Sequence, residues 1–549
     1  MKKMTRTSSW RGWLLCVFLI SLTLKAQELP DREIHYRPGD WISYPVTRYV
    51  TSIALGHQYT YFGTTGGITR FDFYRNRWDV PFTVSDGLGD DDIHVLAYDF
   101  STGYVWCATN AGLSFRIPSS QQWLNMSYES LGIDGVSAIG TGKEFLWLMT
   151  PGRTLRGDRR GGSFWDSTPE EEESDDVQWY GGREQYRFES ANHLFMEGGY
   201  TFFTEGYIQD SYLRQFDVTD AFEDNFFRLW LATWGLGSGV ADMKSYFLEL
   251  IPFGLYTSEV HAMAWDEGGM WIGGFHAVDS PGGITWWNMD NEEWVYFEAP
   301  FITQLRSDIV TAVAAGTRFV WFGTLEGLAR YDKDKDAWRM FSVFNNLWDD
   351  EITCVTLGPT SVWVGTTAGI NRISQPGMIV EKVRDERLIH RHIYFLETDG
   401  DDVWAATDRG IYRYIGDTGR WEYVPGYGGM VDLEVTAASV WENEVWFGTD
   451  DGIEKLDKHT HEWQGFPATH YPTGGTIYNI LADSGDVWVG TEDGVLKYIK
   501  RENRWRRFTT EDGLLHNSVR WILLDGDYIW FGTGRGLTRF YWNAPYRVD

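Results

Sequence analysis

Cysteines, positive charges and long apolar runs are all scarce in this chain of 549 residues. Only three cysteines are present. Cys107 and Cys354 are the two outside the N-terminal apolar run, and two cysteines cannot staple a chain this long. Each occupies a strand-like apolar position, so we expect two buried free thiols. Lysine and arginine number 48 against 78 acidic residues, a net charge of −30. That balance argues against nucleic acid as a partner and disfavours docking on anionic lipid.

A single apolar run, residues 13–24, stands at the N-terminus behind Lys2, Lys3, Arg6 and Arg11. Twelve residues are too few to span a bilayer. The basic start and the small residue Ala26 predict a secretory signal peptide over residues 1–26, followed by a linker over 27–39. Cys16 follows Leu15 rather than a small residue, so we expect no lipid anchor. No later segment is apolar enough to cross a membrane, and we expect no integral membrane segment after cleavage.

The rest of the chain repeats one unit. "VWFGTLEGLARYD" (320–332) recurs as "VWVGTTAGINRIS" (362–374), "VWFGTDDGIEKLD" (445–457) and "IWFGTGRGLTRFY" (529–541). The clear copies are anchored by Tyr61, Trp106, Trp321, Trp363, Trp404, Trp446, Trp488 and Trp530, and weaker copies by Trp147, Phe195, Trp230 and Trp271. The last six copies are spaced by 41 or 42 residues. A second tryptophan, as in "WRMFSV" and "WRRFTT", stands seventeen residues after many anchors.

Each unit reads as four short strands with period-2 alternation and dense glycine. Four strands per unit of this length is one blade of a β-propeller. The last glycine of "GTxxG", such as Gly327, is predicted to turn the hairpin between strands two and three. The first glycine, such as Gly448, would allow close approach of a neighbouring backbone. The anchoring aromatic would fill the wedge between blades.

The fold prediction is therefore all-β, with about twelve four-stranded blades in residues 47–549. The copies are regular over 47–125 and 305–541 and irregular over 126–304. The last unit lacks its fourth strand, and "DWISYPV" (40–46) has the form of one, so we predict that Trp41 opens the strand closing the last blade. Because propellers typically have four to eight blades, we expect two propellers, one of them discontinuous. One large twelve-bladed ring is the alternative.

A link signature joins blades as "SDGLGDDDI" (85–93), "NNLWDDEI" (345–352) and "EDGLLHNSV" (511–519). Its leucines, Leu88, Leu347 and Leu514, are expected to plug the core. Together, "WFGT..GL.RYD" and "DGL...N.V" resemble the two-component regulator propeller repeat. That repeat builds periplasmic sensor regions of hybrid histidine kinases and also occurs in exported propellers, including an accessory protein of type IX secretion. The resemblance implies a sensor-like propeller, and we expect no output domain and no β-sandwich in this chain.

No motif of catalytic or cofactor chemistry stands out. "DKDKDAW" (332–338) lacks the glycine and the glutamate of a calcium loop. "GLGSGV" (235–240) precedes no helical pattern, which argues against phosphate binding. The histidines are scattered along the chain. We therefore expect neither a metal nor a cofactor. A basic residue recurs in strand three (Arg70, Arg330, Arg372, Arg413, Lys497, Arg539). Cross-strand pairing with acids explains it better than a ring of ligand-binding cations.

Irregular copies are the better place to look for a site, because insertions in repeats map to loops on one face. The hairpins between strands two and three share a face with the inter-blade links, and those of residues 150–285 are expanded or irregular. We hypothesise a recognition surface formed by Arg153, Arg156, Trp234, Phe275, His276 and Asp279. Drift in tolerant loops is the competing explanation.

These features predict an exported propeller that binds or scaffolds in the periplasm or at the cell surface of a Gram-negative-type bacterium. Its partner would be a glycan, a peptide or an envelope protein, and no nucleic acid. Enzymatic activity is uncertain: a carbohydrate-active lyase or hydrolase on a propeller scaffold is one alternative. A structural component of an envelope or secretion complex is another.

Overall fold

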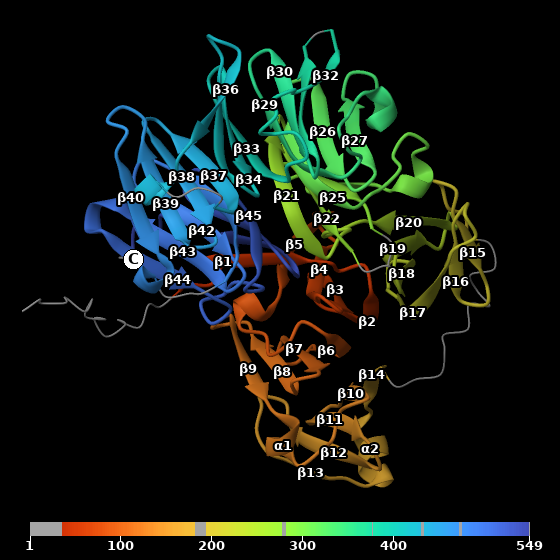
Figure 1. Cartoon of the computed structure of the whole chain (residues 1–549). Coiled ribbons are helices and arrows are strands. Elements are labelled where there is room, and N and C mark those ends of the chain that lie inside the picture. Colours follow the sequence, from red (N-terminus) through yellow and green to blue (C-terminus); the bar gives the residue numbers. More distant parts are fainter. Residues whose placement is uncertain are drawn as a thin grey trace, which may run out of the picture.

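The computed structural model of the chain describes residues 36–181, 194–276, 282–375, 377–429, 433–471 and 475–547. Its strands form eleven sheets, each built mainly of antiparallel neighbours in sequence order. The sheets belong to two units, a closed ring of seven blades and a smaller unit of four (Figure 1). The predicted all-β propeller class is confirmed, as is the division into two propeller units.

The larger unit takes its blades from residues 259–540 and one strand from the N-terminus. Its strands are β21 (Glu259–Asp266), β22 (Gly269–Phe275), β23 (Ile284–Asn288), β24 (Glu293–Phe297); β25 (Val310–Ala315), β26 (Phe319–Thr324), β27 (Gly327–Asp332), β28 (Ala337–Phe341); β29 (Ile352–Leu357), β30 (Ser361–Thr366), β31 (Gly369–Ser374), β32 (Val380–Lys382); β33 (Ile393–Asp399), β34 (Asp402–Thr407), β35 (Gly410–Ile415), β36 (Arg420–Val424); β37 (Val435–Trp441), β38 (Glu444–Thr449), β39 (Gly452–Asp457), β40 (Trp463–Pro467); β41 (Ile477–Ala482), β42 (Asp486–Thr491), β43 (Gly494–Ile499), β44 (Arg504–Phe508); β45 (Val519–Asp525), β46 (Tyr528–Thr533), β47 (Gly536–Phe540) and β1 (Trp41–Pro45). The inner strands β21, β25, β29, β33, β37, β41 and β45 lie side by side in that order, and β45 returns to β21.

The ring is closed by the two ends of the chain. β1 pairs antiparallel with β47, and Trp41 stands opposite Phe540. Their rings stack with centroids 3.9 Å apart, and Arg547 forms a buried ion pair with Asp40 at 3.1 Å. Closure removes an open sheet edge. The predicted closing strand is confirmed, and the alternative of one twelve-bladed ring is wrong.

The smaller unit is inserted between β1 and β21. Its strands are β2 (Val50–Leu55), β3 (Tyr59–Thr64), β4 (Gly67–Asp72), β5 (Arg77–Phe82); β6 (Ile93–Asp99), β7 (Tyr104–Thr109), β8 (Leu113–Ile117), β9 (Gln122–Met126); β10 (Ala138–Thr141), β11 (Phe145–Thr150), β12 (Arg153–Asp158), β13 (Phe164–Asp166), β14 (Gln178–Gly181); β15 (Thr201–Phe203), β16 (Tyr207–Gln209), β17 (Gln215–Glu223), β18 (Arg228–Thr233), β19 (Gly237–Asp242) and β20 (Phe247–Ile251). Inner strands β17, β2, β6 and β10 are neighbours in that order. The short helices α1 (Tyr128–Leu131) and α2 (Pro169–Asp175) also belong to this unit.

The blade count differs from the expected twelve at Phe195. This residue forms only an isolated parallel bridge with Phe247 and is 67% exposed. The neighbouring short strands β15 and β16 extend the sheet of β17 instead of building a blade of their own. Phe195 therefore anchors no blade in the part of the chain that the structure describes, because it has no second-strand position from which to fill a wedge.

The repeat residues hold the blades as the sequence predicts. Trp321, Trp404 and the other anchoring tryptophans of the regular copies are buried; Trp404 reaches Phe447 of the next blade at 5.8 Å. Gly327 turns β26 into β27 with φ of +125°, where a side chain would be strained. A Cβ at Gly448 would lie 2.5 Å from Ile477 of the next blade, so close blade packing requires glycine there.

Three of the strand-three cations, Arg70, Arg413 and Lys497, pair with acids as predicted, and all six lie over aromatic rings. Arg413 forms an ion pair with Asp402 on the adjacent strand at 2.6 Å. Its guanidinium carbon lies 5.1 Å from the ring centroid of Trp404, its direct cross-strand neighbour. Lys497 and its anchor Trp488 repeat this arrangement. These cations are structural, because each is held by a carboxylate or an aromatic face.

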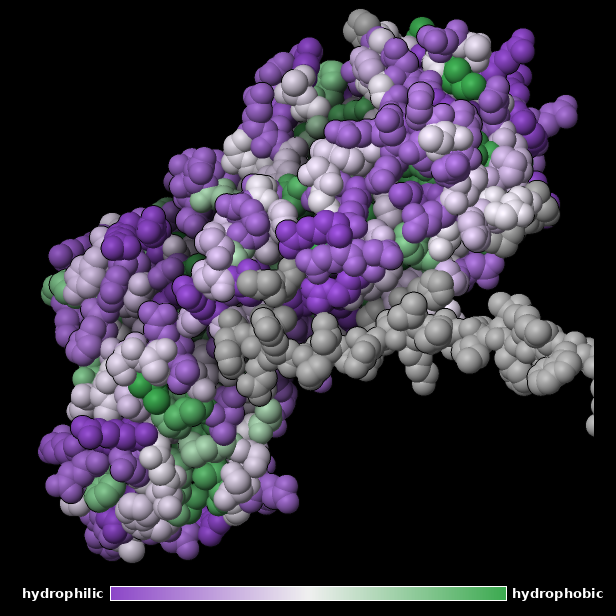
Figure 2. Space-filling view, turned by 90° about the vertical axis from the view of Figure 1, so that its left-hand side faces the viewer, coloured by the Kyte–Doolittle hydropathy of each residue, from purple (hydrophilic) through white to green (hydrophobic). Residues whose placement is uncertain are grey.

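Two connectors, residues 46–49 and 252–258, join the units. Thr47 of the first donates its hydroxyl to the Phe253 carbonyl of the second at 2.8 Å. The Phe253 ring lies 4.8 Å from Trp78 of the smaller unit and 5.4 Å from Trp294 of the larger. One aromatic core thus crosses the junction and fixes the units against each other. On the face shown in Figure 2, hydrophilic residues predominate over the larger part of the molecule, and hydrophobic residues gather on the lower lobe.

Candidate functional site

The structure separates the six residues of the predicted recognition surface. Arg153 and Arg156 lie on β12, at the far end of the smaller unit (Figure 1). Arg153 pairs with Asp166 at 3.0 Å and Arg156 with Glu171 at 2.6 Å. Both guanidinium groups are therefore engaged within their own blade.

Three others gather where the units meet. Trp234 follows β18, is 46% exposed and lies 5.1 Å from the Tyr49 ring. Phe275 ends β22, and its ring contacts His261 at 4.2 Å. His276 lies next to it, with Nε2 3.3 Å from the Asp308 carboxylate. Asp279 lies outside the described residues.

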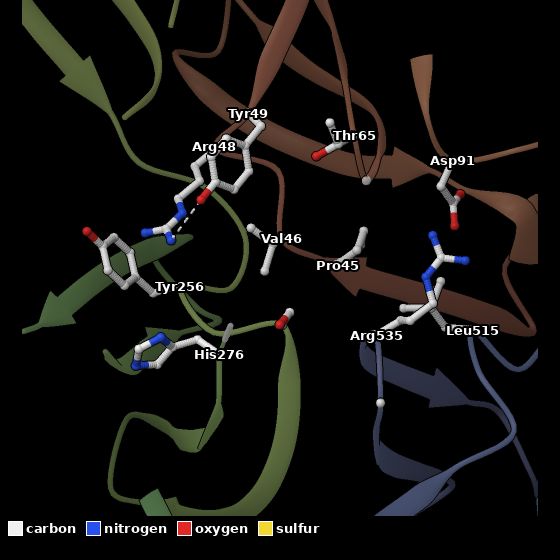
Figure 3. Close-up of a pocket in the computed structure, with 13 residues that line it drawn as sticks. Pro45, Val46, Arg48, Tyr49, Thr65, Asp91, Tyr256, His276, Leu515 and Arg535 are labelled. Atoms are coloured by element: carbon white, nitrogen blue, oxygen red, sulfur yellow. Dashed lines mark hydrogen bonds between the residues drawn. The ribbon is translucent and has the colours of Figure 1, made fainter. Parts of the chain in front are cut away.

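At this junction lies a cavity of about 220 Å³, here called the ring-junction cleft. Its walls come from Pro45 at the end of β1, the connector 46–49, the β3–β4 turn, the links before β6, β21 and β45, the β46–β47 turn and His276. In both units, the cleft lies on the face that carries the inter-blade links and the hairpins between strands two and three. Recognition is predicted from the sequence to take place on that face. Figure 3 shows polar side chains at two ends of the cleft, with Pro45 and Val46 between them.

Arg48 forms one end. Its guanidinium carbon lies 4.0 Å from the Tyr256 ring centroid, and its Nη2 donates to the Tyr49 hydroxyl at 3.3 Å. The Arg48 carbonyl accepts from Gly235 and Gly237 of the glycine-rich hairpin, at 3.0 and 2.9 Å. Burial raises the pKa of Tyr256 well above its ordinary range, so its phenol stays protonated.

Asp91 and Arg535 form the other end. Arg535 stands in the exposed β46–β47 turn, and its guanidinium points toward the Asp91 carboxyl (Figure 3). Asp91 is 1% exposed; Oδ1 accepts the Val84 N–H at 2.7 Å, whereas Oδ2 has no hydrogen-bond partner among the described residues. Burial raises the Asp91 pKa to about 6, and the charge of Arg535 opposes the shift.

Sequence reasoning missed Arg48, Asp91, Tyr256 and Arg535 individually. Asp91 belongs to the link signature and Arg535 to the repeat motif, so both read as scaffold. Arg48 and Tyr256 lie in connectors that follow no repeat. Only the choice of face pointed toward them, because the crossing points between the units could not be placed from spacing.

No three histidine, cysteine, aspartate or glutamate side chains are grouped to hold a metal ion in the described ranges. The acidic hairpin 332–336 has protein partners instead. Arg318 contacts Asp332 at 2.9 Å and Asp334 at 3.2 Å, and Tyr331 donates to Asp336 at 2.9 Å. Nor does any helix in these ranges have the length and apolarity needed to cross a membrane.

The sequence matches no model of a protein family, and no curated protein matches it significantly. Among solved structures, it is similar to PorZ, an essential bacterial surface component of the type-IX secretion system of Porphyromonas gingivalis. The two chains are 13% identical with a TM-score of 0.55, over 92% of this chain and 87% of that one. At this identity the likeness shows a shared fold.

Two further structures match less well. The extracellular domain of BT3049 from B. thetaiotaomicron is 16% identical, with a TM-score of 0.45 over 93% of this chain and 76% of that one. YCF48 bound to D1 peptide is 14% identical, with a TM-score of 0.42 over 52% of this chain and 94% of that one.

Proposed function

We propose that this chain is a binding protein that acts outside the cytoplasm and holds a segment of a protein partner in the ring-junction cleft. The observation that carries the proposal is the cleft itself. It is the place where loops of both units converge, and it combines aromatic rings, two arginines and a buried carboxyl.

The size of the cleft favours a polypeptide over a free small molecule. Sites for drug-sized ligands enclose roughly 300–1,000 Å³, and this cavity holds about 220 Å³. It suits one or two side chains that anchor a larger partner. The exposed ring of Trp234 beside it adds apolar contact area of the kind enriched in interface hot spots.

The charges at the two ends suit a polar segment. A partner carboxylate can approach the exposed guanidinium of Arg535. The acidic chain as a whole would repel other acidic surfaces, so these cationic groups would set the orientation of the partner at short range.

Two observations support a location outside the cytoplasm. The N-terminal sequence has the form of a secretory signal, and the fold is shared with PorZ, which is a bacterial surface component. A surface or periplasmic propeller that binds or scaffolds envelope proteins is consistent with both. The resemblance of the repeat to that of sensor propellers also supports a role in recognition outside the cytoplasm.

Selection of a displayed peptide library against the protein, followed by affinity measurement on variants, tests the proposal. The double variant Trp234→Ala, His276→Ala should weaken the best selected peptide at least about tenfold, the effect of losing ~1.4 kcal/mol. Trp165→Ala is the matched control, because Trp165 is 42% exposed and lies on a distant blade. Equal affinity of the double variant and the control would refute the assignment. A parallel glycan array that alone yielded ligands would contradict a protein partner.

A further inference from the structure

A β-bulge near the start of the inner strand is found in ten of the blades. The extra residue of a bulge is unpaired and its side chain is re-aimed. Five bulges carry threonine, and each hydroxyl donates to a backbone carbonyl at the start of the next blade, as Thr311 does to Ile352 at 2.6 Å. The usual role of the bulge residue is therefore to link neighbouring blades by a hydrogen bond.

Three consecutive blades of the larger ring depart from this pattern. Their bulge residues are Tyr478 on β41, Arg520 on β45 and His261 on β21. All three are partly exposed. Because β41, β45 and β21 are adjacent around the ring, the three large polar side chains stand together at one side of its mouth. Of the remaining non-threonine bulge residues, His94 lies in the smaller unit, and Tyr394 lies on β33, which β37 separates from β41.

A direct contact joins two of the three side chains. The Arg520 guanidinium carbon lies 4.5 Å from the Tyr478 ring centroid. Burial, and then the nearby charge of Arg520, lower the His261 pKa to about 4. His261 is thus neutral at pH 7 and retains one N–H. Its Nε2 lies 3.3 Å from Glu259, and its ring rests on Phe275.

Arg520 differs from the paired cations of strand three. Its Nε is buried without a hydrogen-bond partner, and no carboxylate forms an ion pair with it in the described part of the chain. A guanidinium fork presents N–H donors that match the oxygens of carboxylates and phosphates. The chain as a whole has a net charge of −30. Arg520 is nevertheless partly exposed, stacked on a tyrosine and without an ion pair among the described residues, so it is a candidate binding group for a ligand of opposite charge.

We propose that Arg520, Tyr478 and His261 form a binding site for an oxyanion group, a carboxylate or a phosphate, at the mouth of the seven-bladed ring. Arg520 supplies the charge and the donor fork. Tyr478 holds the guanidinium plane by stacking, and His261, whose Nε2 is within hydrogen-bond distance of Glu259, lines the site as a neutral ring. None of these three residues lines the ring-junction cleft, and the proposal does not depend on the function proposed for that cleft.

Labelling of arginines with phenylglyoxal, read residue by residue by mass spectrometry, tests the site in the unmodified full chain. Labelling is measured at pH 7 in chloride, inorganic phosphate and acetate of equal ionic strength. With an anion at four times its Kd, the labelling rate of Arg520 should fall about fivefold. Arg75, whose side chain is 64% exposed in the smaller unit, serves as the internal control and should be unaffected. The salt that protects Arg520 more strongly, phosphate or acetate, shows whether the site prefers a phosphate or a carboxylate group.

Equal rates of Arg520 labelling in all three salts, or equal protection of Arg75, would overturn the proposal. So would an Arg520 that does not react in chloride, since its guanidinium would then be closed to solvent. A second measurement compares thermal stabilisation by the protecting anion: Arg520→Gln should lose it, whereas Arg75→Gln should keep it. A folded Arg520→Gln variant that is stabilised as much as the wild type would also refute the site.

Discussion

Replacing Asp91 by asparagine should make the protein more stable at neutral pH. The carboxyl is buried in the link before β6, and its Oδ1 accepts the Val84 N–H. An amide oxygen can accept the same bond: in the link before β45, Asn517 accepts from Thr510 at 2.9 Å. The substitution therefore keeps the loop geometry and removes a charge that is poorly solvated.

The size of the effect follows from proton linkage. Burial raises the Asp91 pKa from its ordinary 3.8 to about 6. A difference of about two pKa units corresponds to roughly 3 kcal/mol, an upper bound because the loop can relax. The pKa of Asp91 is higher in the folded than in the unfolded protein. Its contribution to the free energy of unfolding is therefore fully present below pH 3.8 and is lost as the pH rises through about 6. The asparagine variant has no such loss.

Urea unfolding followed by tryptophan fluorescence, at intervals from pH 4 to pH 8, measures the difference. Asp91→Asn should have the higher unfolding midpoint at pH 8, and the gap should shrink toward pH 4. Asp350→Asn is the matched control: Asp350 accepts the Val343 N–H at 2.7 Å in the equivalent link but is less buried, so a smaller gap is expected. A wild type as stable as the variant at pH 8, or a gap independent of pH, would refute the reasoning.

Other substitutions test the repeat and its closure. Gly448→Ala should destabilise the larger ring by about 1–3 kcal/mol, because the added methyl group overpacks against the next blade. The control Gly135→Ala, with nothing within 4 Å of the added Cβ, should leave the free energy of unfolding unchanged in a denaturant titration. Similar losses in both variants would contradict the close approach of the blades at Gly448. Trp41→Ala removes the ring stacked on Phe540 and should cost about 3–5 kcal/mol, seen as a lower midpoint of thermal unfolding, and an unchanged midpoint would mean that β1 contributes little to closure. Burial raises the pKa of Cys354 to about 12, so this thiol should resist iodoacetamide in the native protein at pH 8 and react only after unfolding; rapid native labelling would show that it is accessible.

The repeat made the architecture predictable. Spacing of tryptophan and glycine identified blades, and the missing fourth strand of the last unit pointed to Trp41. The two buried thiols and the buried link leucines were also predicted correctly. Each of these features depends on contacts between neighbouring blades, so a periodic sequence records them directly.

The blade count and the cleft could not be predicted in the same way. The sequence around Phe195 resembles that of the anchoring aromatics. Only the strand pairing in the structure shows that Phe195 does not lie between two blades. Arg48 and Asp91 line opposite ends of the cleft and come from different segments, and no periodicity links a connector to a repeat. Similarly, Arg520 lies within a regular copy, and its significance appears only when the bulge positions of adjacent blades are compared in space.

The pairing of β1 with β47 also determines the order in which the chain can fold. Ser43 and Thr538, which share a buried hydrogen bond at 2.9 Å, are 495 positions apart. The smaller unit is continuous in sequence and can fold as soon as it emerges, because domains generally fold as units from the N-terminus. The larger ring must wait for its last blade, with β1 already released but unpaired. Until closure, β47 presents an open edge to other chains, so the interval between emergence and closure is when the protein is most exposed to aggregation and most in need of chaperones.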